Sequence, residues 1–200
     1  CYCDIIFCVS EASRVNLVDI CTHLKLRVPH CLTIPTGSGF KLPKQGSDQK
    51  KWQRRESLQK ILLVGTVEPR KNYEQLLRCV KALTALNIEI HLVGKKGWIS
   101  KETLIALEQA NKTSRNFTWH HSCTDSELVE HYSSTGLLVS LSHFEGFGLP
   151  VSEALSTGLP VLHSDDPAMQ EASQGCALLF KRDDDRSLIN AISRLAEDKN

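Results

Sequence analysis

From position 60 onward the chain alternates short apolar runs with longer segments in which apolar residues recur every three to four positions. The first run, Lys60–Gly65, is typical of a buried strand bounded by glycine, and Leu76, Val80 and Leu83 then share one face of a helix. Strands that alternate with helices form parallel sheets covered on both faces. The sequence therefore predicts an α/β fold.

The remaining elements continue this alternation. Further strands are expected over Ile88–Val93, Phe117–His120, Gly136–Leu141, Pro160–His163 and Ala177–Phe180. Helices are expected over Lys101–Gln109, from the capping-box sequence at Thr124–Glu127 to Ser133, and over a last segment with Leu188, Ile189, Ile192 and Leu195 on one face.

The first forty residues predict a separate, smaller unit. A strand is expected over Asp4–Val9, a helix over Glu11–Leu24 with Ser10 as its cap, and a strand over Cys31–Pro35. One strand–helix–strand unit cannot bury its apolar faces unaided, so we expect a fragment or a protein that lost its first domain. We assign 1–40 to a domain remnant, 41–58 to a linker and 59–200 to a full domain.

The predicted linker carries Lys50, Lys51, Arg54 and Arg55. A solvated connection is the favoured interpretation of this charge run, and a basic patch at a cleft or an anionic membrane surface is the alternative.

Composition limits the class of protein. A hydrophobic content of 41% supports a full core, and the net charge of +1 argues against a nucleic-acid partner. The eight cysteines lie mostly in apolar segments, which indicates reduced thiols and a cytoplasmic protein. We expect neither a membrane span nor a signal peptide.

One stretch carries most of the chemistry. An apolar run ends at Leu141, Gly146 and Gly148 open a tight loop, and Pro150 suits the first turn of a helix. A strand, a glycine loop and a helix N-terminus together form a typical phosphate site. Glu145 and Glu153 can both face the opening of this predicted site, and carboxylates accept hydrogen bonds from sugar hydroxyls. The combination suggests a ligand with a diphosphate between two sugars.

Glu145 and Glu153 are separated by seven residues within Glu-Gly-Phe-Gly-Leu-Pro-Val-Ser-Glu-Ala. This stretch resembles the E-x7-E motif of retaining nucleotide-sugar glycosyltransferases with the GT-B architecture, the group 1 or family 4 type. The similarity covers the chain from about Ile5 to its end. It implies that 59–200 form a Rossmann-like, donor-binding C-terminal domain and that 1–40 belong to an N-terminal acceptor domain.

The resemblance implies a role for each site residue. Glu145 is expected to hold sugar hydroxyls and Glu153 the ribose diol. The diphosphate is expected on the backbone of the glycine loop. His143 lies beside Glu145 in the sequence and is a candidate for lining the sugar pocket, with a polar group satisfied at the loop edge as the alternative. The donor-binding residues are Gly146, Phe147, Gly148, Leu149, Glu153, Thr66 and His143.

A second loop, Gly65–Asn72, leaves the carboxyl end of the first predicted strand, where α/β sheets bind ligands. Arg70 and Lys71 there can neutralise a leaving diphosphate, while an exposed basic helix start is the alternative. By the resemblance, Lys71 is the phosphate-binding lysine. Thr66 replaces an arginine found in some relatives, and Arg70 is expected to take over its role.

Other candidates are weaker. The loop Gly94–Trp98 matches a family loop near the nucleobase, or it is a surface feature. His120, His121 and Cys123 are not expected to bind zinc, because adjacent histidines on a strand point to opposite faces. Asp183–Asp185 is interpreted as a helix N-cap. Glu171 matches a family glutamate, expected in a loop.

The resemblance implies transfer of a hexose, mannose or glucose, to a hydroxyl of a glycan or lipid-linked acceptor in polysaccharide or glycoconjugate synthesis. It implies no metal or other cofactor, and a location in the cytoplasm with peripheral membrane contact. No residue is a convincing covalent nucleophile, so front-face attack is the expected mechanism. The alternative is a nucleotide-sugar-binding module that is inactive without an acceptor domain.

Overall fold

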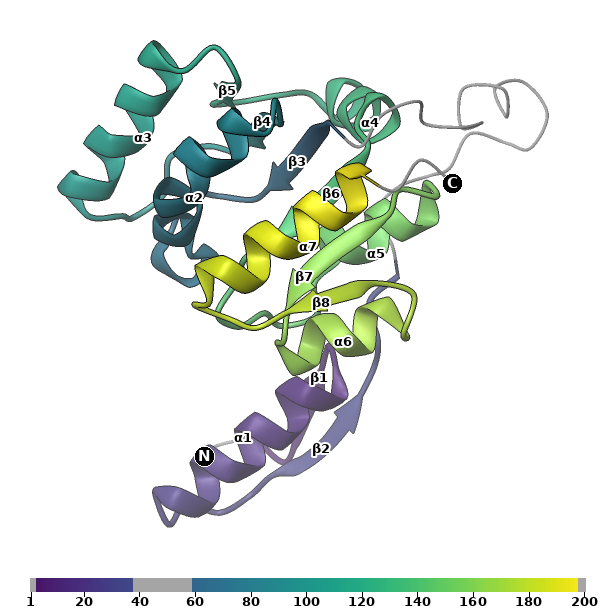
Figure 1. Cartoon of the computed structure of the whole chain (residues 1–200). Helices are drawn as coiled ribbons and strands as arrows, with labels where there is room; N and C mark the ends of the chain where they lie inside the picture. The colour runs from purple at the N-terminus through teal and green to yellow at the C-terminus, as the bar shows by residue number, and fades with distance from the viewer. Residues whose placement is uncertain (1–2, 38–58, 198–200) are drawn as a thin grey trace.

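The computed structural model describes residues 3–37 and 59–197. These residues form a small two-stranded unit and a larger domain built on six strands (Figure 1). The predicted linker at 41–58, with its basic cluster, lies outside the described residues.

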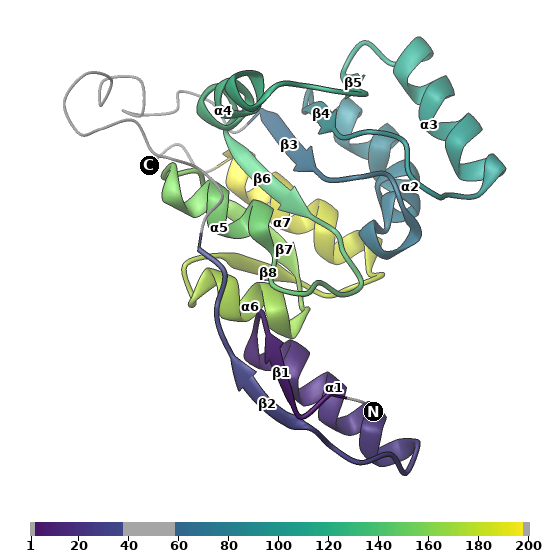
Figure 2. The same cartoon turned by 180° about the vertical axis from the view of Figure 1, so that it is seen from behind.

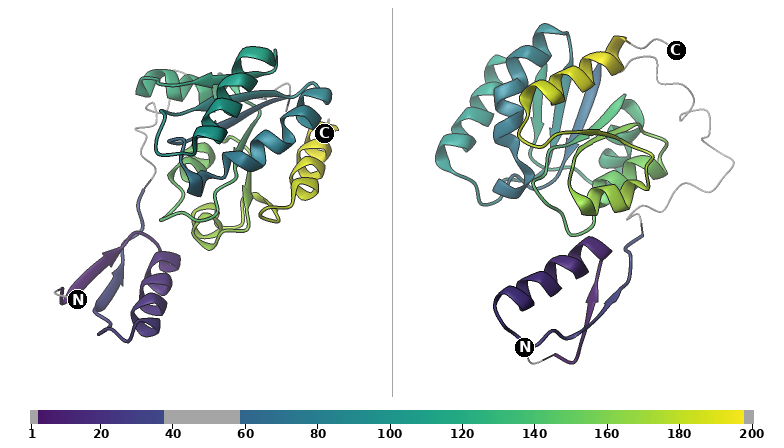
Figure 3. Two further views of the ribbon diagram at one scale, coloured as in Figure 1. Left: turned by 90° about the vertical axis from the view of Figure 1, so that its left-hand side faces the viewer. Right: turned by 60° about the horizontal axis from the view of Figure 1, so that its bottom comes forward.

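The small unit has the predicted order of elements. Strands β1 (Ile5–Cys8) and β2 (His30–Thr33) pair in parallel, and α1 (Glu11–His23) connects them. The Oγ of Ser10 accepts a hydrogen bond from the N–H of Ser13, which caps α1 as predicted. Figure 3 shows the unit projecting from the larger domain, with the N-terminal end of α1 beside α6. Many of its apolar side chains are exposed.

The larger domain contains one parallel sheet with the strand order β5-β4-β3-β6-β7-β8. The strands are β3 (Lys60–Val64), β4 (Glu89–Val93), β5 (Phe117–His120), β6 (Leu137–Ser140), β7 (Val161–Ser164) and β8 (Leu178–Phe180). The order reverses between β3 and β6, which are neighbours although two other strands separate them in sequence. Open α/β sheets bind ligands at such a switch point, outside the carboxyl ends of the strands.

Helices cover both faces of the sheet, as the sequence predicted. The helices are α2 (Tyr73–Ala85), α3 (Lys101–Thr113), α4 (Asp125–Ser134), α5 (Leu149–Ser156), α6 (Pro167–Ser173) and α7 (Asp185–Glu197). Ile61 and Leu63 face a core with α2, α3 and α7 (Figure 1), whereas Leu62 faces a core with α4, α5 and α6 (Figure 2). Side chains alternate along a strand, so one short apolar run supplies both cores.

Two short elements were not predicted. A 3-10 turn, η2, spans Pro69–Lys71, and α6 spans Pro167–Ser173. The expectation of a loop around Glu171 is therefore wrong, because Glu171 lies in α6. A helix this short has too few residues for an apolar period to stand out, although Asp166 caps it and Pro167 starts it.

The cysteine prediction holds in part. Every cysteine in the described ranges is a free thiol; Cys8, Cys21 and Cys79 are buried, whereas Cys3 and Cys176 are exposed. Free thiols are consistent with the predicted reducing compartment, which stays a prediction.

Candidate functional site

The site lies at the switch point between β3 and β6. The loop after β3 carries Arg70 and Lys71, and the loop after β6 carries Glu145. The two loops are joined where the N–H of His143 donates to the carbonyl of Arg70 at 2.8 Å. Residues that are distant in sequence therefore meet at one edge of the sheet.

Lys71 is a buried cation whose position depends on a glycine. The side chain of Lys71 is 8% exposed, so the alternative of an exposed basic helix start is wrong. It lies against Gly65, which has φ +147°; a Cβ at Gly65 would come within 2.8 Å of the Lys71 Cε. The hydroxyl of Tyr73 donates to the Gly65 carbonyl at 3.0 Å. Only glycine at the end of β3 leaves room for the lysine in this conformation.

Glu145 is the centre of the site. Its carboxylate accepts hydrogen bonds from Arg70 Nη1 at 2.5 Å, from Lys71 Nζ at 2.6 Å and from Ser142 Oγ at 2.7 Å. Arg70 also pairs with Glu68, with 2.7 Å between Nε and Oε1. Burial by itself raises the pKa of Glu145, but the Lys71 charge and the hydrogen bonds from Lys71 and Ser142 outweigh it and hold the pKa below its ordinary value. Glu145 is thus an ionised, buried carboxylate between two cations.

The start of α5 forms the second side of the site. Gly148 precedes the helix with φ +98°, and Pro150 occupies its first turn, as the sequence predicted. A Cβ at Gly148 would lie 3.1 Å from the Met169 Cγ in α6, so the loop packs closely there. Phe147 is half-buried and Leu149 is exposed. A helix N-terminus therefore lies at the same edge as the cations.

Glu153 lies further along α5, among different partners from Glu145. Its carboxylate accepts a hydrogen bond from the hydroxyl of Tyr132, in α4, at 2.8 Å. Burial raises the pKa of Glu153, whereas the Tyr132 hydrogen bond and the charge of Lys71 act in the opposite direction. Lys71 is thus close enough to influence both glutamates of the motif.

Two more predicted residues lie around this centre. Thr66 follows Gly65, and its Cγ2 packs against Gly97, where a Cβ would come within 2.6 Å. This contact brings the Gly94–Trp98 loop to the same sheet edge, although Trp98 itself is 71% exposed. His143 extends its Nδ1 toward Asp183, at 3.6 Å from Oδ2.

The loop before α7 joins the site, which sequence reasoning missed. The Arg182 guanidinium donates to the carbonyl of His143, and Asn72 donates to Asp183 at 3.2 Å. Asp184 accepts from the N–H of Ser187 at 3.0 Å, so the predicted helix cap is confirmed at this position. Asp183 has a φ of +60°, and its side chain accepts from Asn72, while Asp184 caps the helix.

The small unit also contacts the site, and this too was missed. Ser10 and Ser13 both donate to the carbonyl of Gly146, at 2.5 and 2.7 Å. The Glu171 carboxylate accepts from the first two N–H groups of α1, at 2.9 and 3.1 Å. A carboxylate at a helix N-terminus satisfies orphan donors and complements the dipole. These contacts fix α1 beside the glycine loop.

The histidines considered for zinc separate in the structure. The ring of His121 packs on Trp119, with 4.1 Å between centroids, whereas His120 turns toward His91. No helix in the described ranges is both long and apolar enough to span a bilayer.

Comparison with known proteins identifies the family. The family described as "Glycosyl transferases group 1" matches residues 44–200. The serotype-specific mannosyltransferase WbdA of Escherichia coli is 32% identical over 134 residues, which cover 66% of this chain and 16% of WbdA. The O-antigen chain mannosyltransferase B of Escherichia coli is 28% identical over 198 residues, 94% of this chain and 49% of the relative. The chain thus spans half or less of the length of these relatives.

A solved structure shares the fold. Alr3699/HepE of Anabaena, crystallised in complex with UDP and glucose, matches with a TM-score of 0.76 over 98% of this chain and 54% of that one, at 16% identity. At this identity the likeness concerns the fold, which is that of the GT-B glycosyltransferases. The family match covers well over half of the sequence, and the chain therefore belongs to the group 1 glycosyl transferases.

Proposed function

We propose that this chain is the donor-binding half of a retaining glycosyltransferase, which moves a hexose from a nucleoside diphosphate to a hydroxyl acceptor. The observation that carries the proposal is the cluster of Arg70, Lys71 and Glu145 beside the N-terminus of α5. Negative charge grows on the diphosphate as the glycosyl bond breaks, and two cations and a helix N-terminus stabilise it. Family membership supports the same reaction class.

Each residue has a role in this proposal. Lys71 and Arg70 bind the diphosphate together with the backbone of residues 146–149. Glu145 orients both cations before the donor binds, and it accepts hydrogen bonds from sugar hydroxyls once the cations contact phosphate. Glu153, held by Tyr132, accepts hydrogen bonds from the ribose diol.

In this proposal, front-face attack retains the configuration at the anomeric carbon. The departing phosphate accepts the proton of the acceptor hydroxyl on the face from which it leaves, so the new bond forms on the same face. The protein then positions the reactants and stabilises charge, and it needs no covalent nucleophile. We propose no metal requirement for this step.

The relatives narrow the substrates. Both curated relatives described above are named mannosyltransferases, and one is named for the O-antigen chain. We therefore propose mannose, with glucose as the second choice, and a glycan or lipid-linked acceptor in polysaccharide synthesis. A cytoplasmic location with peripheral membrane contact fits such an acceptor.

The acceptor site is proposed to lie in a further domain. Exposed apolar side chains are concentrated on the small unit; they include Ile5, Phe7, Ile20, Leu24 and Ile34, each more than half exposed. Such a surface is typical of one that packs against other strands and helices. Without that partner, the chain is the nucleotide-sugar-binding module given above as the alternative.

Calorimetry on the 200-residue chain tests donor binding, with GDP-mannose, UDP-glucose, GDP and UDP as ligands. We expect millimolar or tighter affinity for one base, and Lys71→Ala to weaken it by about tenfold, or about 1.4 kcal/mol. Lys81→Ala, on the exposed side of α2, is the matched control. A folded sample that binds none of the four ligands would reject the proposal.

A transfer assay separates the two functional alternatives. The isolated chain is expected to bind donor but to transfer sugar negligibly, since positioning a second substrate supplies roughly 7–11 kcal/mol of barrier reduction. Transfer by the chain alone at around 1 to 10³ per second would show that no further domain is required.

A further inference from the structure

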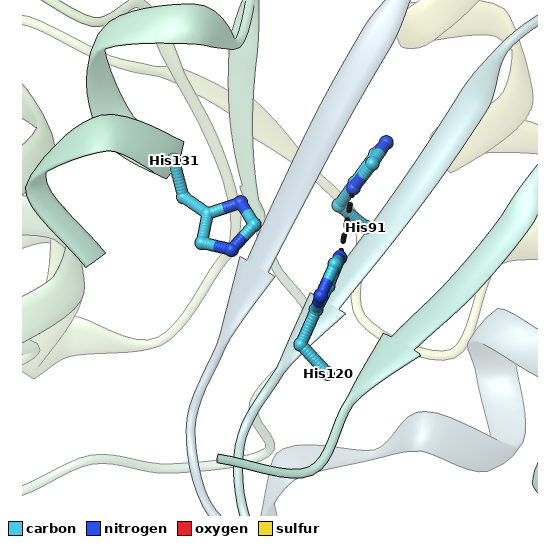
Figure 4. Close-up of side chains that lie close together, drawn as sticks. All are labelled: His91, His120 and His131. Carbon is cyan, nitrogen blue, oxygen red and sulfur yellow. Dashed lines mark hydrogen bonds between the residues drawn. The ribbon is translucent and has the colours of Figure 1, made fainter. Parts of the chain in front are cut away.

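Three histidines from three elements meet on the face of the sheet covered by α4. They are His91 in β4, His120 at the end of β5 and His131 in the last turn of α4. One ring nitrogen of each lies within 4.8 Å of the others (Figure 4). The register pairs Val93 with His120, so His91 and His120 lie two residues apart on one face of neighbouring strands.

The distances suit a shared cation. The Nδ1 of His91 and the Nε2 of His120 are 3.1 Å apart. Two nitrogens bound to a tetrahedral Zn²⁺ at about 2.0–2.1 Å are about 3.3 Å apart. The separation therefore fits either of two arrangements. One ring can donate a hydrogen bond to the other, or both nitrogens can bind the same metal ion through their lone pairs. The ring of His131 lies 4.5 Å from that of His120 between centroids, with an angle of 59° between the two ring planes.

The surroundings favour a cation with an open coordination position. The histidines line a cavity of about 400 Å³ that also includes Cys123, Glu127, Glu130 and Lys60. The Glu89 Oε2 lies 3.8 Å from the His91 Nε2, which is too far for a hydrogen bond but adds negative charge beside the ring. Lys60 opposes a cation here, whereas Glu127 and Glu130, which line the same cavity, attract one.

We propose that His91, His120 and His131 form a binding site for a divalent transition metal of the zinc type, with the fourth position open to the cavity. This site is separate from the transfer step, for which no metal is proposed, and it joins His120 to His91 and His131 rather than to His121 and Cys123. The bound ion joins α4 to β4 and β5. It stabilises the fold because it binds the folded chain and not the unfolded one.

The test uses the metal-free 200-residue chain, titrated with Zn²⁺ against a chromophoric chelator. We expect about one equivalent to bind, and each of His91→Gln, His120→Gln and His131→Gln to weaken it by more than about tenfold, since even outer-shell changes cost about 10- to 100-fold. His121→Gln is the matched control, because His121 neighbours His120 but packs on Trp119. Equal affinity in all four variants, or no saturable binding, overturns the proposal.

A second measurement needs no variant and guards against misfolding. Cu²⁺ bound to the unmodified chain is expected to show electron-paramagnetic-resonance splitting from imidazole nitrogens, and Co²⁺ is expected to show no thiolate charge-transfer band. A thiolate band without imidazole splitting would assign the metal to cysteines instead and reject the histidine site. Binding of Zn²⁺ is also expected to raise the melting temperature, and the same His→Gln variants are expected to abolish that rise.

Discussion

Replacing Glu145 by glutamine removes the charge that holds the two cations of the site. The carboxylate contacts Lys71 at 2.6 Å, and the two side chains are 9% and 8% exposed. Removing one partner of a buried ion pair costs about 3–5 kcal/mol, because the other charge stays buried and unpaired. Glutamine keeps one oxygen as an acceptor, and Arg70, 34% exposed, keeps Glu68 as a partner. We therefore expect a loss of about 2–3 kcal/mol in the free energy of unfolding at pH 7.

The pH dependence of this loss follows from the pKa of Glu145. Its folded-state pKa lies below the ordinary value of 4.5. The carboxylate thus contributes stability above pH 4.5, and that stability is lost as the pH falls through the folded-state pKa. The difference in stability between the unmodified chain and Glu145→Gln is expected to be constant near neutral pH and to shrink in acid.

Urea denaturation at several pH values measures the effect, with Glu108→Gln on the exposed face of α3 as the control. A saturating nucleoside diphosphate is expected to reduce the difference in stability between the unmodified chain and Glu145→Gln at pH 7. Its phosphates take the place of the lost carboxylate beside Lys71 and Arg70. Equal stability of Glu145→Gln and Glu108→Gln would refute the assignment of a buried, ionised Glu145. If the nucleotide increases this difference in stability, the proposed binding of phosphate by Lys71 and Arg70 is refuted.

Three further predictions follow from individual contacts. Gly65→Ala is expected to destabilise the fold by about 1–3 kcal/mol in urea denaturation, because its φ of +147° and the nearby Lys71 both oppose a side chain; a neutral result contradicts the packing described. Glu153→Gln is expected to keep or raise the free energy of unfolding at pH 7, because burial raises the pKa of Glu153 and the ionised carboxylate therefore destabilises the fold. Its affinity for nucleotide, measured by calorimetry, is expected to fall by about 1–3 kcal/mol. Unchanged affinity would argue against a ribose contact. Glu171→Gln is expected to speed hydrogen exchange at the start of α1 but not in β3, and uniform exchange in both segments would show that this contact does not hold the small unit.

Much of the fold was predictable because its signals are local. Apolar runs, helix periods and capping residues act over a few positions, so all the strands and the longer helices from β3 to α7 followed from them. The glycine loop before α5 was predictable for the same reason. Gly148 permits a positive φ, and Pro150 favours the first turn of a helix, whatever the surrounding fold. The η2 turn and α6 were not predicted, because each has too few residues for an apolar period to stand out.

The sequence by itself determined the α/β class, the loops at the carboxyl ends of the strands and the residue types available there. The tertiary structure decided which of these residues meet. Glu145 binds Lys71 because β3 and β6 are neighbours, and His91 joins His120 and His131 because β4 pairs with β5 beneath α4. Strand order and register arise from the packing of the whole sheet, which local periodicity does not encode. A buried ion pair and a histidine cluster therefore became visible only when the strands were placed side by side.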